Sequence, residues 1–213
     1  MKRFFLLPAA CMSFCMGVNA QDVAPATGEQ QQAMLKNIAA LSGKMKSLTC
    51  DFEQVKEIAM LSEKMASKGK MYYRHDNRVR WEYVSPYAYT LIMNNHKILL
   101  QSGGNKNVID GKSSQLFQGI ISIMTSSING AGLTDSKNFK ADLYWGEKRR
   151  EVVLTPLQKE VKQTFSHIKL TISIKDYSVD KVEMKEPGGD VTIIQLLNKR
   201  FNEEIADSKF SID

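Results

Sequence analysis

The chain has 213 residues and a formal net charge of +6 at neutral pH, a size that suits one domain with a substantial core. Its basic balance does not indicate a nucleic-acid partner, because Lys and Arg alternate with Glu and Asp, as in KEIAMLSEKMASKGK. We therefore expect a mixed-charge surface and no nucleic-acid binding.

The N-terminus has the pattern of a secretory signal peptide. Lys2 and Arg3 precede an uncharged apolar stretch, residues 4–17, and small residues two apart lead up to Ala20. The apolar stretch is shorter than the ~20 residues that a transmembrane helix needs. A lipoprotein signal is the alternative that we consider and favour less. We expect cleavage after residues 1–20 and a single exported domain over residues 21–213.

Cysteine usage limits how this domain is stabilised. After cleavage Cys50 is the only cysteine, so an internal disulfide cannot form. The cysteines also lack the spacing of a zinc site. We expect no structural metal and no cofactor, and stability that comes from packing and backbone pairing.

A helix is the first predicted element of the mature chain. Thr27 and Gln30 have the spacing of a capping box. Apolar residues then recur at helical spacing at Met34, Ile38, Leu41, Met45 and Leu48. Residues 21–28 before the helix are expected to form a loose arm.

Short strands fill most of the remaining chain. The alternation begins near Leu48 and predicts about eleven strands joined by tight turns. The clearest runs are 65–73, 79–83, 87–93, 97–101, 139–145, 151–155, 167–174, 178–184 and 191–197. Such a series is typical of an antiparallel meander, and an open sheet of that length curls or closes.

One uncharged segment, residues 113–128, interrupts the strands. Leu116, Ile120 and Met124 recur every four residues, and a second apolar row lies beside them. A helix of this composition is apolar around more than half of its circumference, whereas a surface helix needs one stripe. We expect it to be buried in the middle of the protein or to cover something apolar that is not always present.

Catalytic motifs are absent from the sequence. The three histidines fall in predicted turns or at strand ends, and neither a nucleophile elbow nor a His-Glu-x-x-His motif occurs. Residues 106–113 end in Gly-Lys-Ser but lack the first glycine of a phosphate loop, so we interpret them as a turn. We expect that the protein is not an enzyme.

The strongest binding signal is an apolar face shared by three neighbouring predicted strands. An ordinary sheet core would have the same pattern. However, the sheet and both predicted helices offer wide apolar faces, and two short helices over one concave sheet leave room for a cavity between them. The candidate face consists of Met71, Tyr73, Val79, Trp81, Tyr83, Leu91 and Met93, with Leu116, Ile120 and Met124 contributed by the covering helix.

Several motifs in order resemble the LolA family of outer-membrane lipoprotein carrier proteins. They are a Phe-x-Gln motif at 52–54, Gly69, an aromatic strand through Trp81, Pro86, VVLTP at 152–156 and a C-terminal hairpin with Asn202, Ile205 and Phe210 in step. Together they cover essentially the whole mature chain.

The resemblance implies a half-open antiparallel β-barrel of eleven strands, with a helical lid over a hydrophobic cavity. It implies a periplasmic, monomeric carrier of acylated lipoproteins, supplied by an inner-membrane lipoprotein-releasing transporter. The cargo would pass to an outer-membrane acceptor or to the outer membrane itself. The family often has an arginine before the Trp strand that latches the lid; here His75 occupies that position and Arg74 precedes it.

Two other functions remain open on the same residues. A lipid- or lipoprotein-sensing regulatory module could use the same fold and the same apolar face. An exported structural β-domain would fill its interior with its own side chains.

Overall fold

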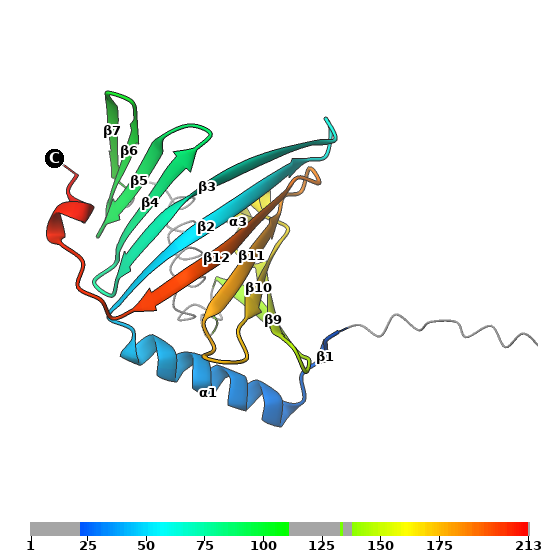
Figure 1. Cartoon of the computed structure of the whole chain (residues 1–213). Helices are drawn as coiled ribbons and strands as arrows, with labels where there is room; N and C mark the ends of the chain where they lie inside the picture. Colours follow the sequence, from blue (N-terminus) through cyan, green and yellow to red (C-terminus); the bar gives the residue numbers. More distant parts are fainter. Residues whose placement is uncertain (1–21, 111–132, 134–137, 213) are drawn as a thin grey trace, which may run out of the picture.

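The computed structural model describes residues 22–110, 133 and 138–212 (Figure 1). The predicted signal peptide and the apolar segment 113–128 lie outside these residues. In chain order the elements are β1 (Ala24–Pro25), α1 (Gly28–Lys44), β2 (Ser47–Ile58), β3 (Glu63–Arg74), β4 (Arg78–Ser85), β5 (Tyr89–Asn94), β6 (Lys97–Ser102), β7 (Asn105–Asp110), β8 (Phe139–Trp145), β9 (Arg150–Pro156), α3 (Lys159–Thr164), β10 (His167–Ile172), β11 (Val179–Lys185), β12 (Val191–Phe201) and the 3-10 helix η3 (Asp207–Phe210).

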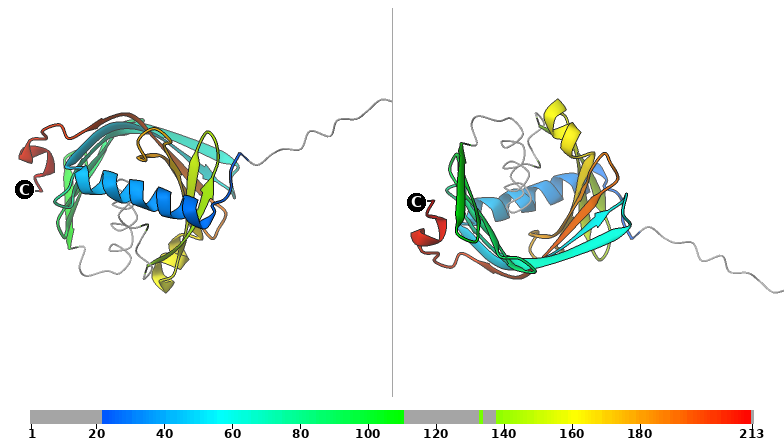
Figure 2. Two further views of the ribbon diagram at one scale, coloured as in Figure 1. Left: turned by 90° about the horizontal axis from the view of Figure 1, so that it is seen from below. Right: turned by 90° about the horizontal axis from the view of Figure 1, so that it is seen from above.

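The strands form one antiparallel sheet of twelve strands in the order β1-β8-β9-β10-β11-β12-β2-β3-β4-β5-β6-β7. Two meanders, β2 to β7 and β8 to β12, lie side by side, and the pairing of β12 with β2 joins them. The sheet bends strongly, and its edge strands β1 and β7 are not joined (Figures 1 and 2). The structure thus confirms the half-open antiparallel barrel expected from the sequence.

Helix α1 lies across one end of the bent sheet (Figure 2). The capping box is present: the Thr27 side chain accepts from the Gln30 backbone, and the Gln30 side chain accepts from the Thr27 backbone. Met34 and Ile38 are buried against the sheet. The predicted stripe runs past the helix, because the helix ends at Lys44 and Leu48 already belongs to β2.

Four segments differ from the sequence prediction. Residues 105–110, interpreted as part of a turn, form the edge strand β7, and Ala24–Pro25 in the expected arm pair with β8. The short helix α3 was not expected. The predicted C-terminal hairpin has only one strand, β12, after which the chain continues as an irregular segment with η3.

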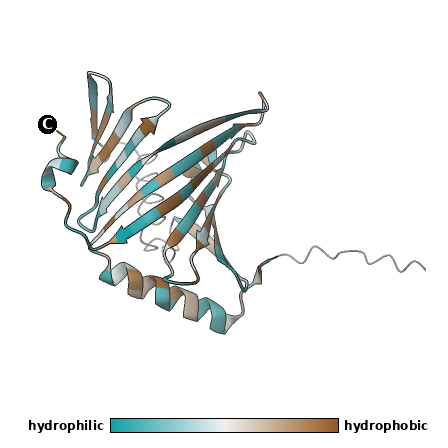
Figure 3. Cartoon of the chain, viewed as in Figure 1, coloured by the Kyte–Doolittle hydropathy of each residue, from teal (hydrophilic) through white to brown (hydrophobic). Residues whose placement is uncertain are grey.

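This C-terminal strap, residues 202–212, packs on the outer face of the sheet. Ile205 and Phe210 are buried there with Ile92 and Leu99 in a small second core. The main core lies on the inner face and includes residues from both meanders and from α1. Hydropathy accordingly alternates along the strands (Figure 3). Among the described residues, no helix has the length and hydropathy to cross a membrane.

Candidate functional site

The strand register places the predicted apolar residues on one inner face. Side chains on the same face of a sheet come from directly paired residues and from every second residue along each strand. One row of paired residues is Leu48, Tyr73, Val79 and Met93; the next is Cys50, Met71, Trp81 and Leu91; the third is Leu196, Phe52, Gly69, Tyr83 and Tyr89. The seven candidates in the described strands therefore form a continuous surface.

This face is almost completely buried. Met71 and Val79 have no exposed surface, and Trp81 retains 9% of its accessible surface. Tyr83 and Leu91 are partly buried against the same core, which also contains Met34 and Ile38 of α1. Access to the most buried residues of the face, Met71 and Val79, would require the parts of the protein that cover them to move.

An aromatic group at the centre of the face depends on a glycine. The Phe52 ring lies 4.4 Å from the Trp81 ring and 5.0 Å from the Tyr83 ring, centroid to centroid. Phe52 is on β2, whereas Trp81 and Tyr83 are on β4, so the contact crosses the intervening strand β3. Gly69 occupies that crossing, and a Cβ there would lie 2.8 Å from the Phe52 ring and 1.9 Å from the Glu82 carbonyl oxygen. The glycine lets the aromatic rings meet across the strand.

The glutamine of the Phe-x-Gln motif contacts the same group. The Tyr83 hydroxyl donates a hydrogen bond of 2.9 Å to Gln54 Oε1. Burial is the main reason why the pKa of Tyr83 is raised, so the phenol stays neutral and remains a donor. The motif thus places an aromatic ring and the acceptor for a buried hydroxyl two residues apart on one strand.

The opposite wall comes from the second meander, which the sequence prediction did not include in the site. Its buried inner residues are Val152, Leu154, Ile168, Leu170, Val182 and Ile194. Alternation along β9, β10 and β11 marks these residues in the sequence. Only the β12–β2 pairing, which has no local signal, shows that they share a core with Trp81.

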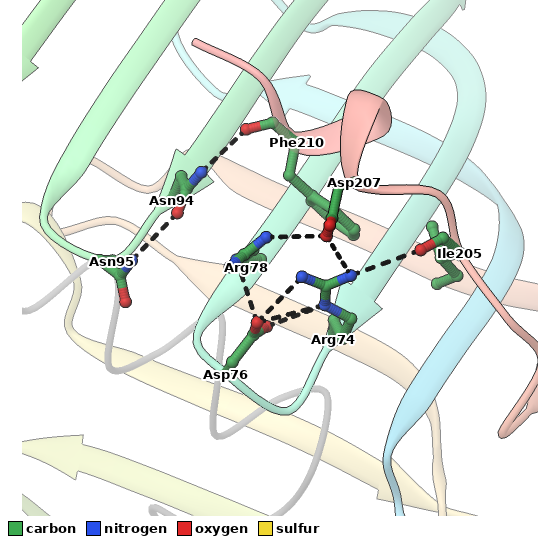
Figure 4. A network of polar contacts seen from close by, with 8 residues as sticks. All are labelled: Arg74, Asp76, Arg78, Asn94, Asn95, Ile205, Asp207 and Phe210. Carbon is green, nitrogen blue, oxygen red and sulfur yellow. Dashed lines mark hydrogen bonds and ion pairs between the residues drawn. The ribbon is translucent and has the colours of Figure 1, made fainter.

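Leu116, Ile120 and Met124, the predicted covering residues, lie outside the described residues. The two latch candidates can be placed (Figure 4). Arg74 forms ion pairs with Asp76 and Asp207 and donates to the Ile205 carbonyl, so its observed contacts hold the C-terminal strap on the outer face. His75 is an exposed turn residue. A latch between either residue and the segment 113–128 stays a prediction.

The strap has further polar contacts on the same side of the sheet. Asp207 also pairs with Arg78, and the Asn94 side chain donates to the Phe210 carbonyl (Figure 4). Hydrogen bonding to Arg74 is the main reason why the pKa of Asp207 is lowered. Among residues 22–110 and 138–212, no group of three His, Cys, Asp or Glu side chains could hold a metal ion.

Comparison with known proteins agrees with this geometry. The family model for the outer membrane lipoprotein carrier protein LolA matches residues 43–213. No protein with a curated description matches the sequence significantly.

Solved structures share the fold at low sequence identity. MucB matches with a TM-score of 0.52 and 12% identity, covering 88% of this chain and 64% of MucB. The MucA/MucB complex of Pseudomonas aeruginosa matches with a TM-score of 0.51 and 10% identity, over 84% of this chain and 59% of the other. A LolA superfamily protein of Nitrosomonas europaea has a TM-score of 0.48 and 11% identity, with coverages of 84% and 96%.

Proposed function

Because this chain belongs to the family of outer membrane lipoprotein carrier proteins, we propose that it is a non-enzymatic periplasmic carrier. In this proposal, residues 1–20 direct export and are removed. The remaining domain takes acylated lipoproteins from an inner-membrane transporter and shields their acyl chains during transfer to the outer membrane. The observation that carries the proposal is the continuous apolar inner face centred on Phe52, Trp81 and Tyr83.

The energetics of the cargo explain why such a face is needed. Each methylene removed from water contributes ~0.8 kcal/mol, so a sixteen-carbon chain carries on the order of 10 kcal/mol of exposure penalty. A shallow surface contact would leave much of that penalty in place. A bent sheet with apolar side chains from two meanders can surround the chain on several sides.

Release is as important as uptake for a carrier. Trp81 and its neighbours are buried within the protein, so the inner face does not present a large exposed apolar surface to water. Acyl entry must therefore displace part of the protein's own apolar cover, and the cost of that displacement lowers the net affinity. Segment 113–128 is our proposed cover, with Leu116, Ile120 and Met124 facing the acyl chain.

Contact with Trp81 gives a direct test. The chain has two tryptophans, and a Trp145→Phe variant leaves Trp81 as the single tryptophan, which can be excited selectively at wavelengths where tyrosine does not absorb. Bromine atoms quench tryptophan fluorescence at short range, so a lipoprotein with brominated acyl chains should quench Trp81 strongly, and the unbrominated form should not. Absence of quenching with lipoprotein bound would refute the proposed acyl site.

A charge on the inner face should weaken uptake. Val79→Glu places a carboxylate at a position with no exposed surface, whereas Val108→Glu makes the same change at a position that is 50% exposed. We expect Val79→Glu to lose most lipoprotein binding and Val108→Glu to retain it. Circular dichroism checks that both variants fold, and the Trp81 quenching measurement does not depend on either.

A regulatory module is the second candidate, favoured by the fold shared with MucB in its complex with MucA. A sensor would bind lipid or lipoprotein and pass a signal to a protein partner. Only a carrier should remove lipoproteins from inner-membrane vesicles and deliver them to acceptor membranes. Binding without release and delivery would favour the sensor.

A further inference from the structure

Exposed apolar side chains gather at one end of the sheet. Eight large apolar side chains are exposed among the described residues, and six of them lie at the end away from α1. These six are Met60, Leu61, Met65, Val84, Tyr87 and Leu157. Ile174, in the turn after β10 at the other end of the sheet, is one of the two exceptions.

The β2–β3 hairpin carries the most exposed members of this group. Met60 is 93% exposed, Leu61 59% and Met65 54%. The hairpin also projects: its pairing with β4 ends at Lys68, and its pairing with β12 ends at Glu57. Residues 58–67 therefore extend past both neighbouring strands, and the tip is apolar (Figure 3).

The base of the hairpin is braced. The Ala59 backbone donates a 3.0 Å hydrogen bond to Asp190 Oδ1, and Lys56 pairs with Glu186 and Asp190 in the β11–β12 turn. These contacts hold the tip in a defined position. Solvent exposure of braced apolar side chains is unfavourable, and nothing in the described core explains it.

From these observations we propose that the β2–β3 tip, Met60, Leu61 and Met65, inserts into the interface of a phospholipid bilayer. The contact would bring one end of the carrier to the receiving membrane. Its role in delivery rests on the proposed function, whereas the lipid contact itself does not.

The shape and composition of the tip favour lipid over a protein partner. A stable protein interface buries roughly 800 Å² on each side and is anchored by Trp, Tyr or Arg. The three side chains of the projecting tip offer neither, because Tyr87, the exposed aromatic residue at this end, lies in the β4–β5 turn and not on the hairpin. A deformable apolar medium can accept a convex point without a matching pocket.

The charges near the tip indicate which lipids it fits. Lys64 pairs with Glu57, and Lys56 pairs with two acidic residues, so these lysines have their charge balanced within the protein. Insertion should therefore depend on apolar burial and not on anionic headgroups. Because even one myristoyl chain binds membranes only marginally, three side chains should give brief contacts, as a carrier that must leave requires.

A fluorescent label at the tip tests this proposal on the whole mature protein. Ser62→Cys places a thiol in the exposed hairpin turn, and Asn95→Cys places one in an exposed turn at the other end; both residues have positive φ. Cys50 is buried and should not compete for the label. With an environment-sensitive dye and phosphatidylcholine vesicles, we expect a blue shift only at position 62, with little change on adding salt.

Substitutions identify the side chains responsible. Met60→Ser combined with Leu61→Ser should lower vesicle binding roughly tenfold or more, because two apolar side chains lose most of their transfer free energy. Ile174→Ser, with 45% exposure at the other end, is the matched control and should bind as wild type. Unchanged binding of the double variant would overturn the proposal.

The remaining outcomes separate the tip from the carrier function. Trp81 quenching by brominated lipoprotein, without any vesicle contact at position 62, would overturn the lipid contact and leave the proposed function intact. Vesicle contact without Trp81 quenching would support the tip and count against the carrier. A label shift that requires an added receiving protein would identify a protein partner and overturn the lipid proposal.

Discussion

At the residue scale, Gly69 shows how closely the inner face is packed. A methyl group there would overlap the Glu82 carbonyl on the neighbouring strand, which cannot move without breaking the β3–β4 pairing. We expect Gly69→Ala to lower the free energy of unfolding by roughly 3 kcal/mol, the upper part of the range for overpacking. Urea unfolding followed by circular dichroism measures it.

Gly104→Ala is the matched control, because a Cβ at position 104 meets no atom within 4 Å. Its free energy of unfolding should stay close to that of the wild type. Equal values for the two variants would show that the aromatic group does not depend on Gly69.

Cys50 is the second residue whose surroundings make a measurable prediction. Burial raises its pKa from an ordinary value of 9.0 to about 12, so the folded protein keeps the thiol protonated. Since the folded-state pKa is the higher one, this contribution to stability is complete below pH 9 and is lost as the pH rises toward 12. At pH 8 we expect a thiol reagent to modify Cys50 only as fast as the protein unfolds.

The exposed thiol of a Ser62→Cys variant is the control and should react at once. A Cys50→Ala variant should also lose less stability than the wild type between pH 9 and 12. Rapid modification of Cys50 in the folded protein would contradict its inward position.

The sequence was most informative about side-chain direction. Period-two alternation placed Val79, Trp81 and Tyr83 on one face, and the register confirms it. The contact of Phe52 with Trp81 could not be predicted from alternation, because it crosses a strand. The Phe-x-Gln motif with Phe52 and the separate Gly69 were both visible in the sequence, but the physical reason for them needed the register.

At the element scale, the C-terminal strap packs on the outer face without being a strand of the sheet, and it should be separable from the sheet. Phe210 is fully buried against Ile92 and Leu99, and the Arg74 guanidinium lies 5.3 Å from the centre of its ring. A buried Phe→Ala change typically costs about 3–5 kcal/mol. We expect Phe210→Ala to detach the strap while the sheet stays folded.

Detachment should speed up both trypsin cleavage after Lys209 and amide exchange of residues 202–212, and these two rates are the measurements. Ser208→Ala, in the same short helix but exposed, should leave both unchanged. Global unfolding of Phe210→Ala would instead show that the strap is part of the cooperative core.

The elements that the prediction missed share a physical cause. Strand β7 (Asn105–Asp110) lies at an edge and is mostly exposed, so its sequence has little apolar alternation. Helix α3 has six residues and no side-chain cap, and the strap has no repeating structure. Long-range packing forms these segments, whereas local patterns predicted the long, half-buried strands.

At the scale of the whole molecule, the pairing of β12 with β2 unites two meanders that are each contiguous in sequence. Residues such as Phe52 and Leu196, far apart in the chain, are directly paired there. No local signal predicts which strands meet, and the sequence alone therefore gave the series of strands without the order of the sheet. The shared inner core depends on this one pairing.

Trp81 lies in the first meander and Trp145 in the second. The fluorescence of each tryptophan therefore reports on the unfolding of the meander that contains it. If the β12–β2 pairing couples the halves, single-tryptophan variants Trp81→Phe and Trp145→Phe should give coincident urea transitions. Gln195→Pro in β12 should separate them, because proline removes a backbone donor from a central strand. Two distinct midpoints in the parent protein would mean that the halves unfold independently. An acyl chain held between them would then be bound by two separate surfaces and not by one continuous core.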